Sequence, residues 1–359
     1  MHRVYQTIFP LKRLVLVFVM IALCLASCAP SKPPELSELV LYSWVDYMPQ
    51  SVMDAFTEQY GITVQYEVYE SPEQAVANLK AGNEYDLVVL TSEFIPQLTE
   101  GNLLRQIDYS RVPNFKYVSA NFRDLAFDPG NTYTVPFHWG TTGILVRTDL
   151  VTRPITGWDD LWDPAFAGRL GIWPISSSMI PIALKSLGYS ANSDNPAELE
   201  AARVRLMQIK PNAVLLSNLE STVIPMLESG EVEIAFGWAY DAMMARESGV
   251  PIEYIIPQEG AILWMDNFII PANARNPEGA EAFLNFILQP EIAAEVINES
   301  YYPMAVDGAE AFVHPEILHD PVIFPDEAQL LNAEIIIPTR SDRKRFFDDI
   351  WFEFLTEQP

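Results

Sequence analysis

The sequence has few positively charged residues, and this shortage excludes whole classes of function. It contains 22 Lys+Arg against 48 Asp+Glu, a formal net charge of −26 at pH 7. A nucleic-acid-binding surface needs clustered basic residues for the phosphate backbone, so we expect no nucleic acid partner. Hydrophobic residues still make up 49% of the 359 residues. That share excludes a disordered acidic chain, and the length predicts two folded domains.

Cysteine and histidine are also scarce, which leaves little for catalysis or metal binding. The sequence has two cysteines, both near its start, and four histidines, of which His314 and His319 fall in a Pro-bounded loop. It has no HExxH motif, no Gly-x-Ser-x-Gly elbow and no glycine-rich phosphate loop. Acidic pairs such as Asp159-Asp160 are typical of solvated faces. We therefore expect a protein that is not an enzyme, with no cofactor and no metal.

The first residues have the order of charge and apolarity that is typical of a bacterial lipoprotein signal peptide. A basic head precedes 12 consecutive apolar residues, 14–25, whereas a membrane-spanning helix needs about 20. The exit Leu25-Ala26-Ser27-Cys28 resembles a lipobox. We expect residues 1–27 to be removed and Cys28 to carry a lipid anchor. The alternative, a buried N-terminal helix of a cytosolic protein, does not explain this order of features.

Cleavage before Cys28 would change both the charge and the thiol content of the chain. It removes three basic residues and no acidic ones, which leaves a net charge of −29 and no cysteine beyond the anchor. Residues 29–38 are rich in Pro and Ser, and we expect residues 28–35 to form a tether that holds the body at the extracytoplasmic face of a membrane.

Strand and helix patterns alternate along the remaining chain and predict an α/β fold. The expected strands are short apolar segments: Leu39–Ser43, Thr63–Glu67, Tyr85–Leu90, Leu170–Trp173, Val214–Ser217, Val232–Trp238, Ile252–Ile256 and Ile262–Ile270. Caps, prolines and glycines predict helices over Ser51–Tyr60, Ser71–Gly82 and Asn195–Ile209, from Asn276 onward, and over Ser341–Leu355. The pattern occurs in two successive sets, so we expect two α/β lobes.

Aromatic residues at the ends of the expected strands are candidates for a ligand pocket. Trp44 and Tyr47 follow the first strand, Trp238 ends a later one, and Trp264 lies beside Asp266. Ligands of parallel α/β sheets bind beyond the carboxyl ends of the strands. Core packing is the alternative, because Trp is mostly buried wherever it occurs.

Seven segments, in order, carry a resemblance to a known family. They are LYSWVDYMP (41–49), YDLVVLTSEF (85–94), TVPFHWGTTGILV (134–146), WDDLWDPAFAGRL (158–170), IAFGWAYDA (234–242), ILWMDNFIIPANARNPEGA (262–280) and YYPMAV (301–306). Together they resemble the spermidine/putrescine-binding proteins of ABC importers over nearly the whole chain after the tether. The resemblance implies a monomer that captures a small organic cation and delivers it to a membrane permease driven by an ATPase.

The family fold implies a type II periplasmic-binding-protein architecture with a ligand cleft between two lobes, each a mostly parallel sheet flanked by helices. By this resemblance, lobe 1 comprises residues 36–141 and 266–304, and lobe 2 comprises 142–265 and 305–359. The chain would cross between the lobes near Trp139–Ile144, Trp264–Phe268 and Tyr302–Ala305.

The resemblance also implies which residues bind the ligand. An aromatic box would enclose the methylene chain of the ligand, formed by Trp44, Tyr47, Trp238, Trp264 and Tyr302. The carboxylates of Asp266 and Asp241 would hold the amines. The hydroxyl of Thr91 would assist in binding. A cation over an aromatic face gains ~0.5–1 kcal/mol when exposed and ~2 kcal/mol or more when desolvated. The alternative for the two aspartates is a helix cap or a salt bridge within the fold.

Departures from the family pattern favour a diamine such as putrescine over spermidine. Spermidine-binding relatives carry two further carboxylates where this chain has Ile175 and Ser178, and a Gln where it has Ile335–Ile337. Glu93 stands at a position that is usually uncharged or aromatic and could restore one negative charge. A surface Glu on a turn is the alternative. His138 and Trp173 are further candidates for the cleft.

Three other functions stay open at this stage. The same fold could bind an amino acid or a quaternary amine, for which Arg147 would have to reach the pocket beside Thr91. A lipoprotein hydrolase would need two cleft carboxylates around a water and no aromatic cage. A sensory or scaffold lipoprotein could share the binding lobes without a permease.

Overall fold

The computed structural model describes residues 37–356, apart from 174, 217–222 and 338–340. The expected signal peptide (1–27), the lipidated Cys28 and the tether (28–35) lie outside the described residues. Among the helices that are described, none has both the length and the apolar composition that crossing a bilayer requires.

The described strands form one sheet, and most of them match the apolar segments expected from the sequence. They are β1 Ser37–Ser43, β2 Ile62–Val68, β3 Leu87–Thr91, β4 Thr134–Arg147, β5 Leu170–Ile172, β6 Ala213–Leu215, β7 Ile234–Trp238, β8 Ile252–Ile255, β9 Ile262–Ile269 and β10 Glu334–Ile335. Their order is β2-β1-β3-β9-β4-β7-β5-β6, with β10 beside β9 and β8 beside β4.

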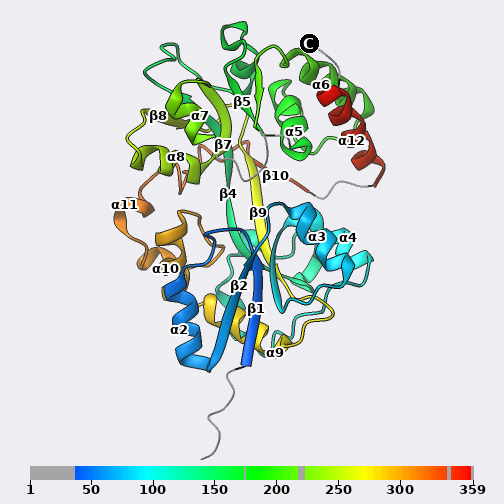
Figure 1. Ribbon diagram of the computed structural model, residues 1–359, viewed down its shortest axis with the longest axis vertical. Helices are drawn as coiled ribbons and strands as arrows, with labels where there is room; N and C mark the ends of the chain where they lie inside the picture. Colours follow the sequence, from blue (N-terminus) through cyan, green and yellow to red (C-terminus); the bar gives the residue numbers. More distant parts are fainter. Residues whose placement is uncertain (1–36, 174, 217–222, 338–340, 357–359) are drawn as a thin grey trace, which may run out of the picture. The chain divides into compact units, whose positions relative to one another are not determined.

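The sheet is mixed, and its antiparallel part lies at the centre. The pairs β1/β3, β5/β6, β5/β7 and β9/β10 are parallel. The pairs β3/β9, β4/β9, β4/β7 and β4/β8 are antiparallel. The antiparallel pairs all contain β4 or β9, the two long strands that run through the middle of Figure 1. The expected α/β class is confirmed.

Helices flank the sheet, and local sequence signals set many of their ends. They are α2 Gln50–Tyr60, α3 Pro72–Ala81, α4 Ile95–Glu100, α5 Ser176–Ser186, α6 Pro196–Gln208, α7 Ile224–Ser229, α8 Ala239–Glu247, α9 Pro277–Ile287, α10 Pro290–Ser300, α11 Pro315–Leu318 and α12 Ser341–Thr356. As expected, Ser71 caps α3 by accepting from the Gln74 amide at 3.2 Å, and Gly82 ends it in the left-handed conformation at φ 85°.

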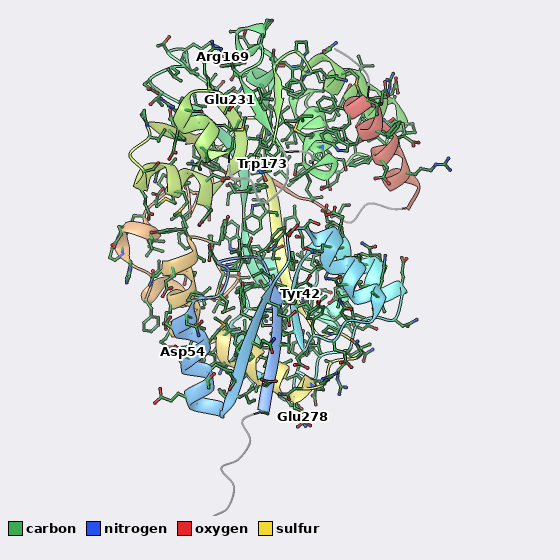
Figure 2. All side chains as sticks on the ribbon, viewed as in Figure 1. Tyr42, Asp54, Arg169, Trp173, Glu231 and Glu278 are labelled. Carbon is green, nitrogen blue, oxygen red and sulfur yellow. The ribbon has the colours of Figure 1, made fainter. Side chains whose placement is uncertain are left out.

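Three clusters of buried side chains form the cores, and β4 and β9 contribute to clusters at both ends of the sheet. Two clusters around β1, β3, α2, α3, α9 and α10 together make up the first core, and the third cluster, around β5, β7, α5, α6 and α12, is the second core. On β4, Phe137 packs in the first core and Ile144 in the second. Figure 2 shows Tyr42 in the part of the molecule that holds the first core and Trp173 in the part that holds the second.

Candidate ligand-binding site

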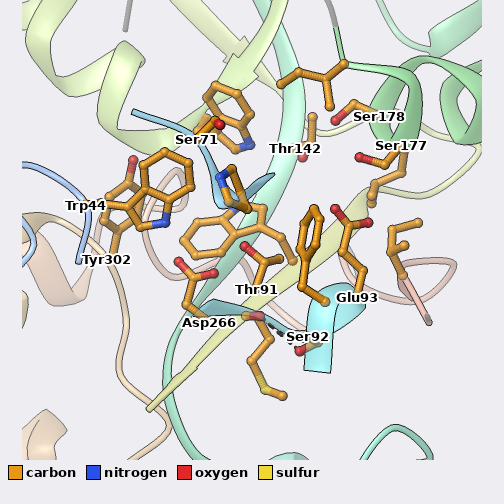
Figure 3. Close-up of a pocket in the computed structure, with 18 of the residues that line it drawn as sticks. Trp44, Ser71, Thr91, Ser92, Glu93, Thr142, Ser177, Ser178, Asp266 and Tyr302 are labelled. Atoms are coloured by element: carbon orange, nitrogen blue, oxygen red, sulfur yellow. Dashed lines mark hydrogen bonds between the residues drawn. The ribbon is translucent and has the colours of Figure 1, made fainter. Parts of the chain in front are cut away.

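A pocket of ≈ 550 Å³ lies where β4 and β9 pass between the two cores. Eight of the nine expected ligand-binding residues line it: Trp44, Tyr47, Thr91, Glu93, Trp238, Trp264, Asp266 and Tyr302. Figure 3 shows side chains from several separate elements converging on this space. The pocket therefore collects residues that are up to 258 positions apart in the sequence, from Trp44 to Tyr302.

Strand β9 positions Trp264 and Asp266. The two residues are separated by one position, so their side chains leave the strand on the same face. Asp266 pairs with Thr91 at the end of β3, and Trp264 pairs with Gly140 of β4. A Cβ at Gly140 would lie 2.5 Å from Cζ2 of the Trp264 indole, so only glycine lets the ring lie this close to β4.

Two tight turns bring further aromatic rings to Trp264. Asp46, between Trp44 and Tyr47, has φ 58°, and Tyr301, directly before Tyr302, also has φ 58°. The ring centroid of Tyr302 lies 5.1 Å from that of Trp264 and 5.4 Å from that of Tyr47. These are normal distances for aromatic contacts, so the rings form a continuous wall.

Asp266 is the most strongly perturbed carboxyl group in this wall. It is only 2% exposed, and burial raises its pKa from 3.8 to about 6. Hydrogen bonds from the side chains of Thr91, Tyr47 and Trp44 lower the pKa of Asp266, but burial has the larger effect and the net shift is upward. Burial also raises the pKa of Tyr47 well above 10, and the nearby Asp266 adds to that shift.

The pocket is anionic. Four carboxylate residues line it, Asp46, Glu73, Glu93 and Asp266, whereas its described lining includes no Lys, Arg or His. A buried carboxylate without a cationic partner is costly. A ligand that carries positive charge would supply that partner.

Asp241 is placed differently from the other expected ligand residues. It is 5% exposed and is not among the described residues that line the pocket. Its Oδ2 accepts a hydrogen bond from the Trp238 amide at 3.0 Å, at the start of α8. The Asp241 charge nonetheless raises the pKa of Tyr302, after the larger effect of burial. Asp241 thus hydrogen-bonds the backbone that carries Trp238 and acts electrostatically on Tyr302 without lining the pocket.

The other residues considered for the cleft are also held elsewhere. Trp173 is 1% exposed, with its ring 5.0 Å from that of Trp238, and His138 is fully buried. Burial lowers the pKa of His138 to about 3. The guanidinium of Arg147 binds the Asp149 carboxylate at 2.9 Å and does not line the pocket.

Comparison with known proteins identifies the family. The profile of the bacterial extracellular solute-binding proteins matches residues 51–325. A spermidine/putrescine-binding periplasmic protein of Escherichia coli is 37% identical over 299 residues, which cover 82% of this chain and 85% of that protein. The chain belongs to this family.

Other relatives agree with this assignment. A putrescine-binding periplasmic protein of Pseudomonas aeruginosa is 33% identical, covering 80% of this chain and 84% of its own. A solved structure from Listeria monocytogenes, named for a spermidine/putrescine ABC transporter, has a TM-score of 0.80 and 31% identity, covering 90% of this chain and all of that one. These homologues are transporter binding proteins and not enzymes, and their fold is the expected type II periplasmic-binding-protein fold.

Several residues of this solute-binding protein that line the pocket were not expected from the sequence. They are Asp46, Glu73, Phe94, Tyr240, Ser176, Ser177 and Trp351. Asp46 and Tyr240 lie within two residues of expected aromatics, so their positions beside strand ends were a usable signal. Trp351 comes from α12, for which the sequence predicted a helix and no ligand-binding residue.

Proposed function

We propose that this protein captures a polyamine in the pocket between two lobes and delivers it to an ABC permease and its ATPase. The observation that carries the proposal is the anionic, aromatic pocket, in which Asp266 is buried without a protein cation among the described lining residues. An ammonium group would neutralise Asp266, and the rings of Trp264, Tyr302 and Trp44 would enclose the methylene chain. Asp241 would act in binding through Trp238.

We further propose that lobe 1 comprises residues 36–141 and 266–304, and lobe 2 residues 142–265 and 305–359. The buried clusters support this division up to residue 304, because β4 and β9 carry side chains of clusters on both sides; beyond it, Val306, Val313 and Ile317 pack with the side chains of the proposed lobe 1. A ligand that contacts both lobes stabilises the closed arrangement by its differential affinity for that state. Closure would then present the loaded form to the permease.

A putrescine-like diamine is the favoured ligand within this proposal. Ile175 and Ser178 line the pocket where spermidine-binding relatives carry carboxylates, so a third ammonium would lack its partners there. The position of Arg147, bonded to Asp149, weighs against a ligand carboxylate. An amino acid would therefore bind less well than a diamine.

Calorimetric titration tests the proposal directly. The purified protein is titrated with putrescine, cadaverine, spermidine, choline and an amino acid, and thermal unfolding is followed with each. A ligand present at about 100 times its dissociation constant stabilises a protein by ~2.7 kcal/mol. We expect putrescine to bind and to raise the melting temperature more than spermidine. Binding of an amino acid with no response to any polyamine would refute the proposal.

We also propose that Cys28 carries the lipid that anchors the protein. The support is the lipobox-like order Leu25-Ala26-Ser27-Cys28 behind an apolar run. Mass spectrometry of the protein from membranes of its host should find the N-terminal peptide starting at a diacylated Cys28. Cys28→Ala should release the protein from the membrane fraction; equal membrane retention of Cys28→Ala would count against the anchor.

A further inference from the structure

We propose that the hydrogen bond between Tyr301 and Glu247 holds Tyr302 in place in the pocket, so that Tyr301 and Glu247 are positioning residues for ligand binding. The inference rests on the proposed function and extends it, because neither of these two residues lines the pocket. Tyr301 belongs to the proposed lobe 1 and Glu247 to the proposed lobe 2. The hydrogen bond therefore also joins the two lobes beside the site.

The ring of Tyr302 contacts aromatic rings from both proposed lobes. Its centroid lies 5.4 Å from that of Tyr47 in lobe 1 and 6.0 Å from that of Tyr240 in lobe 2. It also meets the Trp264 ring edge to face at 5.1 Å. All three neighbours line the pocket. A displacement of Tyr302 would therefore disturb the aromatic wall on several sides at once.

The backbone directly before Tyr302 has an unfavourable conformation. Tyr301 has φ 58° and ψ 18°, in the left-handed region that residues other than glycine rarely occupy. Such a conformation persists only where the surrounding contacts hold it. The Tyr301 amide donates to the Ile297 carbonyl of α10 at 3.0 Å, and the Tyr302 amide donates to Oγ of Ser300 at 3.2 Å. The phenol of Tyr301 supplies a further contact, on a different part of the chain.

That contact is a charge-assisted hydrogen bond. The Tyr301 hydroxyl donates to Oε1 of Glu247 at 3.0 Å. This bond is the main reason why the pKa of Tyr301 is raised above its ordinary value of 10.0, so the hydroxyl keeps its proton at neutral pH. Hydrogen bonds to an ionised acceptor are stronger than those between neutral groups. Glu247 is exposed, however, so solvent weakens the bond and its effect should be moderate.

One face of α8 runs from the pocket to this bond. Tyr240, Met243 and Glu247 follow one another at intervals of three and four positions, so they share a face of the helix. Tyr240 lines the pocket, and Met243 packs against the first core. Ala242 and Ala245 of the same helix are buried in the second core. Thus α8 belongs to the second core and contacts the first core along one face, as its place next to α10 and α11 in Figure 1 shows.

A double-mutant cycle tests whether the bond acts on the ligand. Putrescine is titrated by calorimetry into the wild-type protein, Tyr301→Phe, Glu247→Ala and the variant that carries both changes. Tyr301→Phe removes only the hydroxyl. Glu253→Ala is the charge control, because it removes an exposed carboxylate from β8. Thermal unfolding of each ligand-free variant separates positioning from stability.

We expect each single variant to weaken putrescine binding by roughly 3- to 10-fold, the range of a typical net hydrogen bond. The double variant should bind no more weakly than either single variant, because both changes remove the same bond. Glu247→Gln should recover most of the affinity, because its amide oxygen still accepts from Tyr301. Glu253→Ala should bind as the wild-type protein does, and the ligand-free melting temperatures should stay close together.

Four outcomes would overturn the assignment. Wild-type affinity in Tyr301→Phe would show that the hydroxyl does not position Tyr302. Losses that multiply in the double variant would mean that the two residues act separately. An equal loss in Glu253→Ala would assign the effect to net charge, and a loss in Glu247→Gln as large as in Glu247→Ala would exclude the hydrogen bond as its cause. A wild-type protein that binds no polyamine would refute the proposed function and this inference with it, whereas the four outcomes above leave the proposed function standing.

Discussion

At the residue scale, Asp266 destabilises the ligand-free protein and provides the charge that binds the ligand. In the folded chain its carboxyl is buried and its pKa is about 6, against an ordinary value of 3.8. Because the folded state holds this proton more tightly than the unfolded state, Asp266 lowers the free energy of unfolding as pH rises through this interval. A ligand ammonium offsets that cost only when it is bound.

Asp266→Asn should therefore stabilise the ligand-free protein at pH 7 while abolishing putrescine binding. A shift of about two pKa units corresponds to ~3 kcal/mol, which is the upper limit of the expected gain, since the amide needs its own hydrogen bonds. Chemical denaturation of the ligand-free protein measures the gain. Asp54→Asn, which neutralises an exposed residue of α2 (Figure 2), is the control. A less stable Asp266→Asn protein would contradict this account.

The same pKa predicts how binding depends on pH. Below pH 6 the ligand-free protein holds a proton on Asp266 that must be released, so putrescine affinity should fall by up to about tenfold per pH unit. His138 should not interfere, because burial lowers its pKa to about 3 and keeps it neutral. Titrations between pH 5 and 8 test this slope. A slope of the same size in Asp266→Asn would assign the proton to another group.

Residues of the pocket differ in how far the sequence could predict them. Trp264 and Asp266 lie inside one expected strand and Thr91 directly follows another, so local pattern and family resemblance together indicate these residues. Glu73 and Trp351 carry no such signal. They reach the pocket because α3 and α12 pack beside it. Local sequence periodicity does not predict which distant elements pack together.

At the element scale, the pairing of β4 with β9 builds the site. The sequence patterns predicted β9 well, since it is an apolar segment interrupted only by Asp266 and Asn267. The patterns did not predict a strand over residues 134–147, because Pro136, Gly140 and Gly143 weaken the strand signal. Only the family resemblance indicated that the chain crosses between the lobes there. The structure explains why residue 140 is a glycine, because the Trp264 indole occupies the space that a side chain at this position would need.

Gly140→Ala should displace Trp264 and weaken putrescine binding by roughly 1–2 kcal/mol, the size of a cation–π contact. The added methyl cannot coexist with an indole carbon 2.5 Å away. Calorimetry gives the affinity, and the emission spectrum of the tryptophans reports the altered environment. The melting temperature of the ligand-free variant is the internal control. Wild-type affinity in Gly140→Ala would show that the ring position is irrelevant to binding.

Some helices are predicted by local capping residues, whereas α5 is held in place by packing against distant parts of the chain. Capping residues predicted α3, α6 and α9, and the structure confirms a side-chain cap for each. The patterns did not delimit α5, which has Pro181 inside it and no side-chain cap. Packing of Met179 and Ile182 in the second core holds α5 instead.

At the scale of the whole molecule, acidity and pocket chemistry act over different distances. Exposed acids lie on both parts of the molecule, for example Asp54, Glu231 and Glu278 in Figure 2. Their field attracts cations, but it is screened beyond about 8 Å at physiological ionic strength. The contacts inside the pocket therefore set affinity, and the surface charge affects the rate of approach.

We expect ligand binding to close the two proposed lobes, because the pocket lies between two cores. Putrescine would contact Asp266 on one side and Trp238 on the other, so ligand binding should shift the population toward the closed form. Small-angle X-ray scattering should show a smaller radius of gyration with putrescine for the wild-type protein. Asp266→Asn at the same putrescine concentration should keep the larger value. Hydrogen exchange should slow at residues 44–47 and 176–178 in the wild-type protein alone. If scattering and exchange were unchanged at saturating putrescine, the pocket would bind without closure, and delivery to a permease would need another signal.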